Sequence, residues 1–352
     1  MKKLNYLFSF AAMAFAMFMV SCDNVDNPAE PDEPVVPEQK IHDGDELATV
    51  VNQYFDVIDG VPTLTLPAGV SVVLNEPIEL YTPYCIKGDA SNPATIKIGE
   101  GGRFIGGLKI ENAVIDASDM ANPLFTFGAE DAEEWTFDHV GLVNVTMTGL
   151  KNALVYSGCK NYDVSLVVEN SYIQVAADVT VFDFTKGSFP ILLKIVNSTF
   201  WAPEATSKSF FSSQSGQKAT ELEGGTETFE FENSTFYNLT KSKNFFSHRQ
   251  SNQTWLEYTV KNNIFVNCGK NGQVIKGMNG GQSGKNPIWD IDGNLFNFDG
   301  DDGVRTDTNE AESTGDDDEP IKNSVAGVVA FEDADNGNFK QSAFEIGDPR
   351  WF

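Results

Sequence analysis

Basic residues are scarce in this chain. Of its 352 residues, 24 are lysine or arginine and 51 are aspartate or glutamate, which gives a net charge of −27 at pH 7. A polyanion would be repelled by such a chain, and no basic stripe with interleaved aromatic residues is present, so nucleic acid is excluded as a partner. The same charge disfavours a strongly anionic substrate, unless calcium bridges the two.

Cysteine is also scarce, with four residues in the whole chain. Cys85, Cys159 and Cys268 lie far apart in sequence and fit no metal-ligand spacing. Because three is an odd number, at least one of them must be unpaired. We expect all three to be buried free thiols that pack as small apolar side chains.

The chain opens on an export signal. Two lysines precede an apolar run from Tyr6 to Val20, which is too short to serve as a membrane span. The run leads to Met19-Val20-Ser21-Cys22, which resembles the lipobox at which bacterial lipoproteins are cut and acylated. We therefore expect residues 1–21 to be a lipoprotein signal peptide and Cys22 to carry the acyl chains that hold the protein on a membrane. Ordinary secretory cleavage is the alternative.

A short tether follows the acylated cysteine. Residues 22–41 contain prolines at intervals of three among acidic residues, so this segment cannot bury a core and should form an extended stalk. The acidic residues next to Cys22 resemble the surface-export signals of Bacteroidetes lipoproteins. That resemblance implies a protein anchored in the outer membrane by its lipid alone and facing the cell exterior.

Residues 42–352 contain a repeat of about 30 residues. One position of the repeat, which we call the column, is asparagine in six of the seven units. In every unit the positions two and four before the column, and three after it, are apolar, whereas the position directly before it is mostly charged. This period-two alternation predicts a half-buried strand that bends at the column and then resumes. The members of the column are separated by 32, 26, 27, 36, 29 and 31 residues and are Asn112, Asn144, Asn170, Asn197, Asn233, Asn262 and Gly293.

A further short strand follows the column in each of several units, at Leu124, Val181, Phe210, Phe245 and Val274. Units of this kind cannot each bury their own apolar face, but stacking them does. The period-two pattern excludes helical repeats, and a propeller needs longer blades with four strands. We therefore predict an all-β fold, a single-stranded right-handed parallel β-helix of about nine coils.

The asparagine column has a structural explanation. A corner that bends inward leaves backbone donors and acceptors facing the core, where side-chain amides satisfy them, and stacked amides form a hydrogen-bonded ladder. Most of the 27 phenylalanines should form internal stacks. A short capping helix is expected within Asp45–Asp59, with Phe55 and Ile58 on its apolar face. Trp351 and Phe352 are expected to seal the opposite end.

From Val61 to Phe352 the chain resembles the pectin-lyase-like β-helix lipoproteins of Bacteroidetes, which are uncharacterised domains linked to polysaccharide utilisation. The resemblance rests on the Leu-Thr-Leu-Pro-Ala-Gly and Ile-Lys-Gly-Asp segments, the Asn-Ser-Thr-Phe turns and the closing Gly-Asp-Pro-Arg-Trp. It implies a carbohydrate ligand, a cell-surface location and contact with other outer-membrane glycan-uptake proteins. It implies no catalytic residue, because fold analogy does not transfer activity.

Two sequence features resemble parts of polysaccharide-degrading β-helix enzymes. Asp138-His139 resembles a pectate lyase strand, but the Arg-x-Pro-x-x-Arg segment of those enzymes is missing, and we expect His139 to face outward into solvent. Asp301-Asp302 resembles the acid pair of polygalacturonases, but the other motifs of those enzymes are absent. We therefore assign no catalytic residue.

An acidic insertion near residues 299–320 precedes the end of the chain. Asp299–Glu319 holds ten acids against Arg305 alone. It is not an EF-hand, because the fifth and sixth positions of a twelve-residue loop would be Gly303 and Val304. We interpret it as a solvated loop and expect no cofactor. Looser calcium binding is the alternative, through Asp299, Asp301 and Asp302.

One segment is a candidate glycan-binding patch. Planar donors hold sugar hydroxyls and aromatic faces stack on C–H surfaces, and such groups gather within nine residues at His248, Arg249, Gln250, Asn252 and Trp255. An ordinary polar corner is the alternative. We therefore predict a non-catalytic surface lipoprotein that binds polysaccharide or oligosaccharide. A polysaccharide lyase or hydrolase and a structural or adhesive rod are the competing hypotheses.

Overall fold

The computed structural model describes ten stretches of the chain and the single residue 274. The stretches are 41–80, 82–127, 139–158, 164–184, 190–213, 227–248, 256–270, 288–297, 321–322 and 325–352. The chain separates into two units, Met1–Lys40 and Ile41–Phe352, and all described residues belong to the second. Within these stretches no helix has the length and apolar character needed to cross a bilayer.

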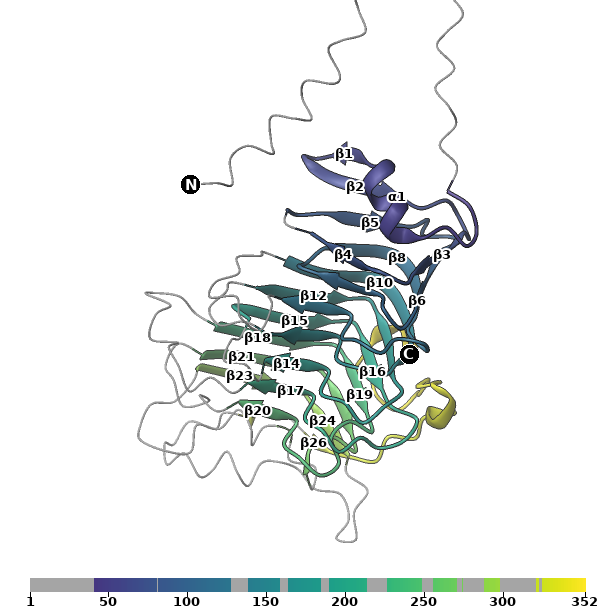
Figure 1. The fold of residues 1–352 in the computed structure, drawn as a ribbon. Helices are drawn as coiled ribbons and strands as arrows, with labels where there is room; N and C mark the ends of the chain where they lie inside the picture. Colours follow the sequence, from purple (N-terminus) through teal and green to yellow (C-terminus); the bar gives the residue numbers. More distant parts are fainter. Residues whose placement is uncertain are drawn as a thin grey trace, which may run out of the picture. The chain divides into compact units, whose positions relative to one another are not determined.

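The second unit is a parallel β-helix, as the sequence predicts (Figure 1). Successive coils add strands to three faces, and each strand pairs in parallel with its equivalent in the next coil. The first face contains β2 (Val61–Thr65), β5 (Cys85–Lys87), β8 (Lys109–Asp116), β10 (His139–Leu150), β12 (Ser165–Glu169), β15 (Leu192–Val196), β18 (Glu227–Glu232), β21 (Leu256–Lys261), β23 (Ile288–Asp292) and β25 (Ile321–Lys322).

The second face follows the first after a bend, and β8 and β10 run through both. Its other strands are β3 (Ser71–Leu74), β6 (Ala94–Ile98), β13 (Tyr172–Val175), β16 (Thr199–Trp201), β19 (Thr235–Tyr237), β22 (Ile264–Val266), β24 (Leu295–Asn297) and β26 (Val325–Ala326). The third face contains β4 (Pro77–Glu79), β7 (Arg103–Ile105), β9 (Phe125–Phe127), β11 (Val155–Ser157), β14 (Phe182–Phe184), β17 (Phe211–Ser213) and β20 (Phe246–His248).

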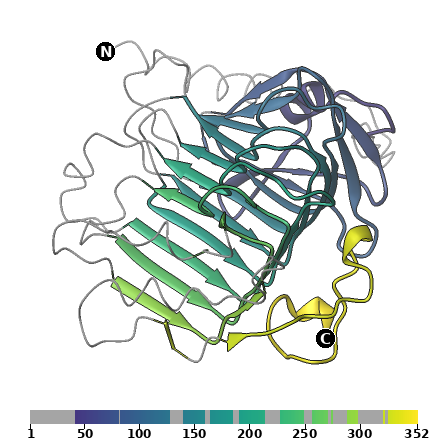
Figure 2. The same cartoon turned by 90° about the horizontal axis from the view of Figure 1, so that it is seen from below.

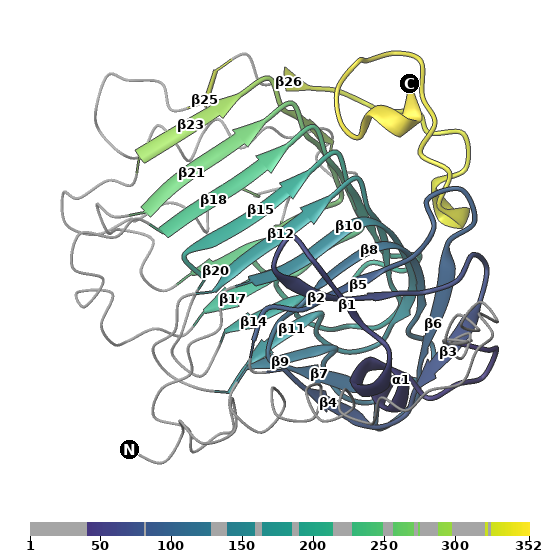
Figure 3. The same ribbon diagram turned by 90° about the horizontal axis from the view of Figure 1, so that it is seen from above.

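The number of coils differs from the nine expected. Ten strands follow one another along the first face, which Figure 3 shows from outside, and seven along the described part of the third. The alternation explains the core, since the apolar positions around the asparagine column are buried wherever their side chains are described. The predicted phenylalanine stacks are confirmed: Phe236 lies 4.9 Å from Phe265, and Phe265 lies 5.4 Å from Phe296, between ring centroids.

The asparagine column turns the chain from the first face to the second. Its six asparagines have φ angles between 48° and 54°, in the left-handed region that asparagine tolerates better than most residues. Gly293 occupies the same position with φ 65°. The predicted amide ladder is confirmed at two steps, where Asn144 donates to Asn112 at 3.0 Å and Asn197 donates to Asn170 at 3.3 Å.

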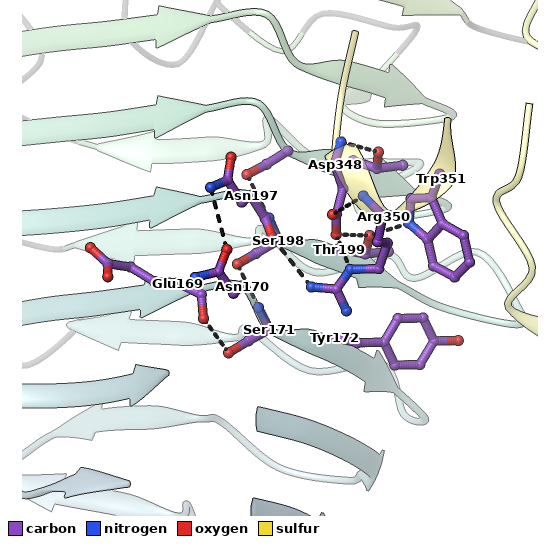
Figure 4. A network of polar contacts seen from close by, with 12 residues as sticks. Glu169, Asn170, Ser171, Tyr172, Asn197, Ser198, Thr199, Asp348, Arg350 and Trp351 are labelled. Carbon is purple, nitrogen blue, oxygen red and sulfur yellow. Dashed lines mark hydrogen bonds and ion pairs between the residues drawn. The ribbon is translucent and has the colours of Figure 1, made fainter. Parts of the chain in front are cut away.

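The expectation that these amides face the core is wrong. The column asparagines are half-buried or exposed, and from Asn170 onward the next residue along the chain carries the buried polar group instead, whereas Ala113 and Val145 occupy that place in the first two units. Ser198 Oγ accepts the Ser171 backbone N–H at 3.0 Å, and Asn263 Oδ1 accepts that of Ser234 at 3.0 Å (Figure 4 shows the Ser171–Ser198 step). The fully buried members of this second column are Ser171, Ser198, Ser234, Asn263 and Asn294.

The N-terminal end is closed by α1 (Leu47–Gln53), which buries Leu47, Val50 and Val51. The predicted capping helix is therefore confirmed, but its extent to Asp59 is wrong. Residues Asp56–Ile58 form β1, which pairs antiparallel with β2 through a two-residue turn. Both turn residues, Asp59 and Gly60, have positive φ (52° and 82°), which suits a tight hairpin. Phe55 and Ile58 are consequently exposed.

The C-terminal segment, residues 327–352, does not seal the end of the helix as expected. It folds back beside the second face (Figure 2), where Phe339 is fully buried and its ring centroid lies 5.8 Å from that of Trp201. The indole N–H of Trp351 donates to Thr199 at 2.8 Å. Phe352, expected to be part of the seal, is 51% exposed.

One buried carboxylate fixes this segment to the second face (Figure 4). Asp348 Oδ2 accepts the hydroxyl of Thr199 at 2.7 Å and lies 2.7 Å from Nε of Arg350. The Asp348 backbone N–H donates to Thr235 at 3.1 Å. Burial raises the pKa of Asp348, while Arg350 and the hydrogen bonds act in the opposite direction.

We predict that Asn197→Ala lowers the free energy of unfolding by about 2–3 kcal/mol, because it removes the ladder amide and places a Cβ-bearing residue without a polar side chain at positive φ. Asn197→Gly removes only the amide and should cost about 1 kcal/mol. Urea unfolding measures both values. Equal losses for the two variants would contradict a role for the left-handed corner.

Phe339→Ala should weaken attachment of the C-terminal segment by about 3–5 kcal/mol, because it empties a fully buried ring site. The matched control is Phe352→Ala, which should change stability by less than about 0.5 kcal/mol, since that ring is half exposed. Limited proteolysis within the segment, together with thermal unfolding, measures the difference. Equal protease resistance of the two variants would show that the segment is not held through this ring.

Candidate functional site

Ion pairs lie among the outward side chains of the first face, beside uncharged ones such as Val167 and Thr259. Lys194 lies 3.1 Å from Glu230 one coil on, and Lys261 lies 2.5 Å from Asp290. Parallel register places these residues opposite each other or on adjacent outward columns of neighbouring strands. Exposed pairs of this kind contribute little to stability. These ion pairs are therefore ordered polar groups on the surface that add little to the free energy of folding.

The same face is hollowed near its N-terminal end by a pocket of about 320 Å³, which we call the first-face pocket. The β1–β2 hairpin forms one wall, and β5, β8 and the start of β10 form the floor. Its lining residues are Ile58, Asp59, Val61, Thr63, Pro83, Tyr84, Cys85, Lys87, Leu108, Lys109, Glu111 and His139. The size is at the lower end of the range for small-molecule sites.

A carboxylate between two ammonium groups is the main polar feature of the pocket. Register places Lys87 directly beside Glu111 on the next coil, and Lys109 lies two residues before Glu111 on the same strand, hence on the same side. Glu111 Oε2 lies 3.5 Å from Nζ of Lys87, while Oε1 accepts a close hydrogen bond from Lys109. Both oxygens of the carboxylate are thus engaged.

Four groups of the pocket have pKa values shifted away from neutral pH. Burial opposes ionisation of Glu111, but the hydrogen bond and charge of Lys109, with the charge of Lys87, lower the pKa of Glu111. The hydrogen bond to Glu111 raises the pKa of Lys109. Burial raises the pKa of Cys85 to about 11 and that of Tyr84 to about 12. Acid–base catalysis requires a pKa near the working pH, so these groups suit binding better than proton transfer.

Apolar and aromatic surface completes the pocket. Tyr84 is fixed, because its hydroxyl donates to the backbone carbonyl of Val51 at 2.9 Å. Pro83, Leu108 and Ile58 line the pocket beside it. Fixed rings and aliphatic groups next to convergent polar side chains are the usual composition of a small-ligand site. Such a site can hold the C–H face of a sugar on one side and its hydroxyls on the other.

A line of outward aromatic residues on the second face is occupied by the chain itself. Trp201 and Tyr237 are in register on neighbouring strands, and Tyr172 lies 6.0 Å from Trp201 between ring centroids. Phe339 of the C-terminal segment packs on Trp201 and Tyr237, and Trp351 packs on Tyr172. These rings are therefore not a free platform for a ligand.

A second hollow, of about 450 Å³, lies between this segment and the second face. It is lined by Tyr237, Val266, Asn267, Asn297 and residues 328–335, which include three acids. It offers no cation among its lining residues. In the part of the chain that the structure describes, no three His, Cys, Asp or Glu side chains gather in a way that could hold a metal ion.

Most site residues expected from the sequence lie outside the described residues. These are Cys22, Arg249, Gln250, Asn252 and Trp255 and the acids Asp299, Asp301 and Asp302. His248 is the last residue of β20, in register with Ser213, and nothing further is described of the patch around it. That patch, the lipidation site and the calcium alternative stay predictions.

One residue discussed in the sequence analysis lies in the pocket. His139 begins β10 and lines the first-face pocket, in agreement with its expected outward direction. The sequence reading missed Lys87, Lys109 and Glu111 as a group. Register aligns Gly88 with Asn112, so extending the asparagine column one coil upstream would have placed Lys87 beside Glu111.

Two of the three buried thiols are also confirmed. Cys85 and Cys268 are free and buried, and Cys159 lies outside the described residues. Burial raises the pKa of Cys268 to about 12, so its thiol stays protonated at neutral pH. No protein-family model matches the chain, and no curated protein matches it in sequence.

Proposed function

We propose that this protein is a cell-surface lipoprotein that binds polysaccharide or oligosaccharide without cleaving it. The observation that carries the proposal is the first-face pocket, where Lys87, Glu111 and Lys109 converge beside a fixed tyrosine and aliphatic side chains. Lysine ammonium groups donate to sugar oxygens, and the carboxylate accepts from sugar hydroxyls. The resolved pKa shifts away from neutral pH favour binding over proton transfer.

The rest of the proposal concerns where the protein works. The lipobox-like segment at Cys22 and the acidic proline-rich tether support lipid anchoring in the outer membrane with the β-helix facing outward. The resemblance to β-helix lipoproteins of Bacteroidetes supports a role in a polysaccharide-utilisation system. Other outer-membrane glycan-uptake proteins are the proposed partners, since captured glycan must pass to a transporter.

Titration calorimetry against plant and host oligosaccharides tests the binding function. At least one neutral or acidic glycan should bind, and the double substitution Lys87→Gln and Lys109→Gln should weaken that binding at least about tenfold, the equivalent of one charge-assisted hydrogen bond. Because the lysines lower the pKa of Glu111, the hydrogen bonds that its carboxylate accepts from a sugar should persist at pH 5 and be lost only in more acidic solution.

The matched control for this experiment is Lys97→Gln, which changes an exposed lysine of β6 on the second face. It should leave glycan affinity unchanged, and the double variant should keep the unfolding midpoint of the parent. Uniform absence of binding across the glycan panel would overturn the proposed function. Binding that survives the double substitution would move the site elsewhere on the protein.

Anchoring makes a separate prediction. In cells fed a labelled fatty acid, the parent protein should carry the label, fractionate with the outer membrane and be cut by protease added to intact cells. Cys22→Ser should remove the label and release the protein from the membrane fraction. Unlabelled parent protein in the soluble fraction would disprove lipidation, and labelled protein that resists external protease would disprove exposure on the cell surface.

A further inference from the structure

The charges of the first-face pocket cancel. Lys87 and Lys109 contribute +2, and Glu111 and Asp59 contribute −2, so the lining is neutral apart from His139. Each ammonium group already contacts a Glu111 oxygen. The side chains of Lys87 and Lys109 are 48% and 41% exposed, however, so their remaining N–H donors can reach a ligand.

A ligand carboxylate would be at a disadvantage at this place. It would compete with Glu111 for the ammonium groups of Lys87 and Lys109. Because Glu111 already contacts both groups, the ligand carboxylate would also lie next to the negative charge of Glu111. Like charges so close together are mutually destabilising. The chain as a whole, at net charge −27, also repels an approaching anion.

A neutral sugar meets no such penalty. One hydroxyl can donate to Glu111 while its oxygen, or that of the adjacent hydroxyl, accepts an N–H from Lys87 or Lys109. The carboxylate is ionised, as its lowered pKa indicates, so the hydrogen bond it accepts is charge-assisted. The apolar wall of Tyr84, Pro83 and Ile58 matches the C–H face of an uncharged ring.

We infer that the first-face pocket selects neutral sugar units over acidic ones, and that Glu111 determines this selectivity. The inference rests on the proposed glycan-binding function and adds the ligand class and the residue that sets it. It also predicts a change in ligand preference that an ion pair with a purely structural role would not show. Removing the charge of Glu111 should release both lysines for a ligand carboxylate and invert the preference.

The test compares matched ligands. Neutral hexasaccharides from glucan, mannan and xylan are compared first, and the one that binds most tightly is chosen. It is then paired with a hexasaccharide of the same linkage that bears uronic acids. For the glucan and mannan hexamers this acidic partner is the product of oxidation at C6. Calorimetry on the whole mature protein should show the neutral member binding at least about tenfold more tightly, as expected for one charge-assisted interaction. Glu111→Gln should weaken the neutral ligand and strengthen the acidic one.

The matched control is Glu230→Gln, which removes a similar carboxylate paired with Lys194 farther along the same face. It should leave both affinities as in the parent, and the unfolding midpoint shows whether either variant is misfolded. Tighter binding of the acidic member by the parent, or an unchanged preference in Glu111→Gln, would overturn the inference while leaving glycan binding intact. Absence of binding by every ligand would overturn the proposed function as well.

Discussion

The structure depends on a corner at which one residue per coil adopts the left-handed conformation. The chain must turn there from the first face to the second while its backbone keeps pairing with the coils on either side. Asparagine tolerates this conformation and links neighbouring coils through its amide, as Asn197 does with Asn170. The following serine or asparagine accepts the buried N–H of the coil before it. A slip of one residue here would turn apolar side chains outward on both faces.

The same register organises the surface. On the first face, β5 and β8 turn Ile86 and Ile110 inward and turn Lys87, Lys109 and Glu111 outward, where these three meet around a small pocket. The second face carries aromatic side chains outward, but the chain's own C-terminal segment covers them. The two outer surfaces therefore differ. The first face presents charged side chains and a pocket to solvent, whereas the aromatic side chains of the second face are buried beneath the C-terminal segment.

Sequence periodicity predicts those parts of the molecule that repeat. The asparagine corner and the phenylalanine stacks repeat in successive coils, so a single chain reveals them. The contact between Asp348 and Thr199 joins residues 149 apart with no periodic signal, and the fold-back of the C-terminus was missed for that reason. The predicted capping helix is too long because Phe55 and Ile58 continue its helical spacing, whereas the Asp59–Gly60 turn makes Asp56–Ile58 a hairpin strand. The pocket was missed because its charges belong to two coils, one of them upstream of the first asparagine.

The C-terminal segment changes how the coils depend on one another. In a solenoid each repeat normally contacts only its neighbours, so the ends can unravel one repeat at a time. Here a single stretch of chain is bonded to Tyr172, Asn197, Thr235 and Asn262, which belong to four successive coils. Those coils cannot separate one by one while the segment is attached. The downstream half of the solenoid is thus expected to melt as one cooperative block, whereas the upstream coils between α1 and β10 lose structure independently of it.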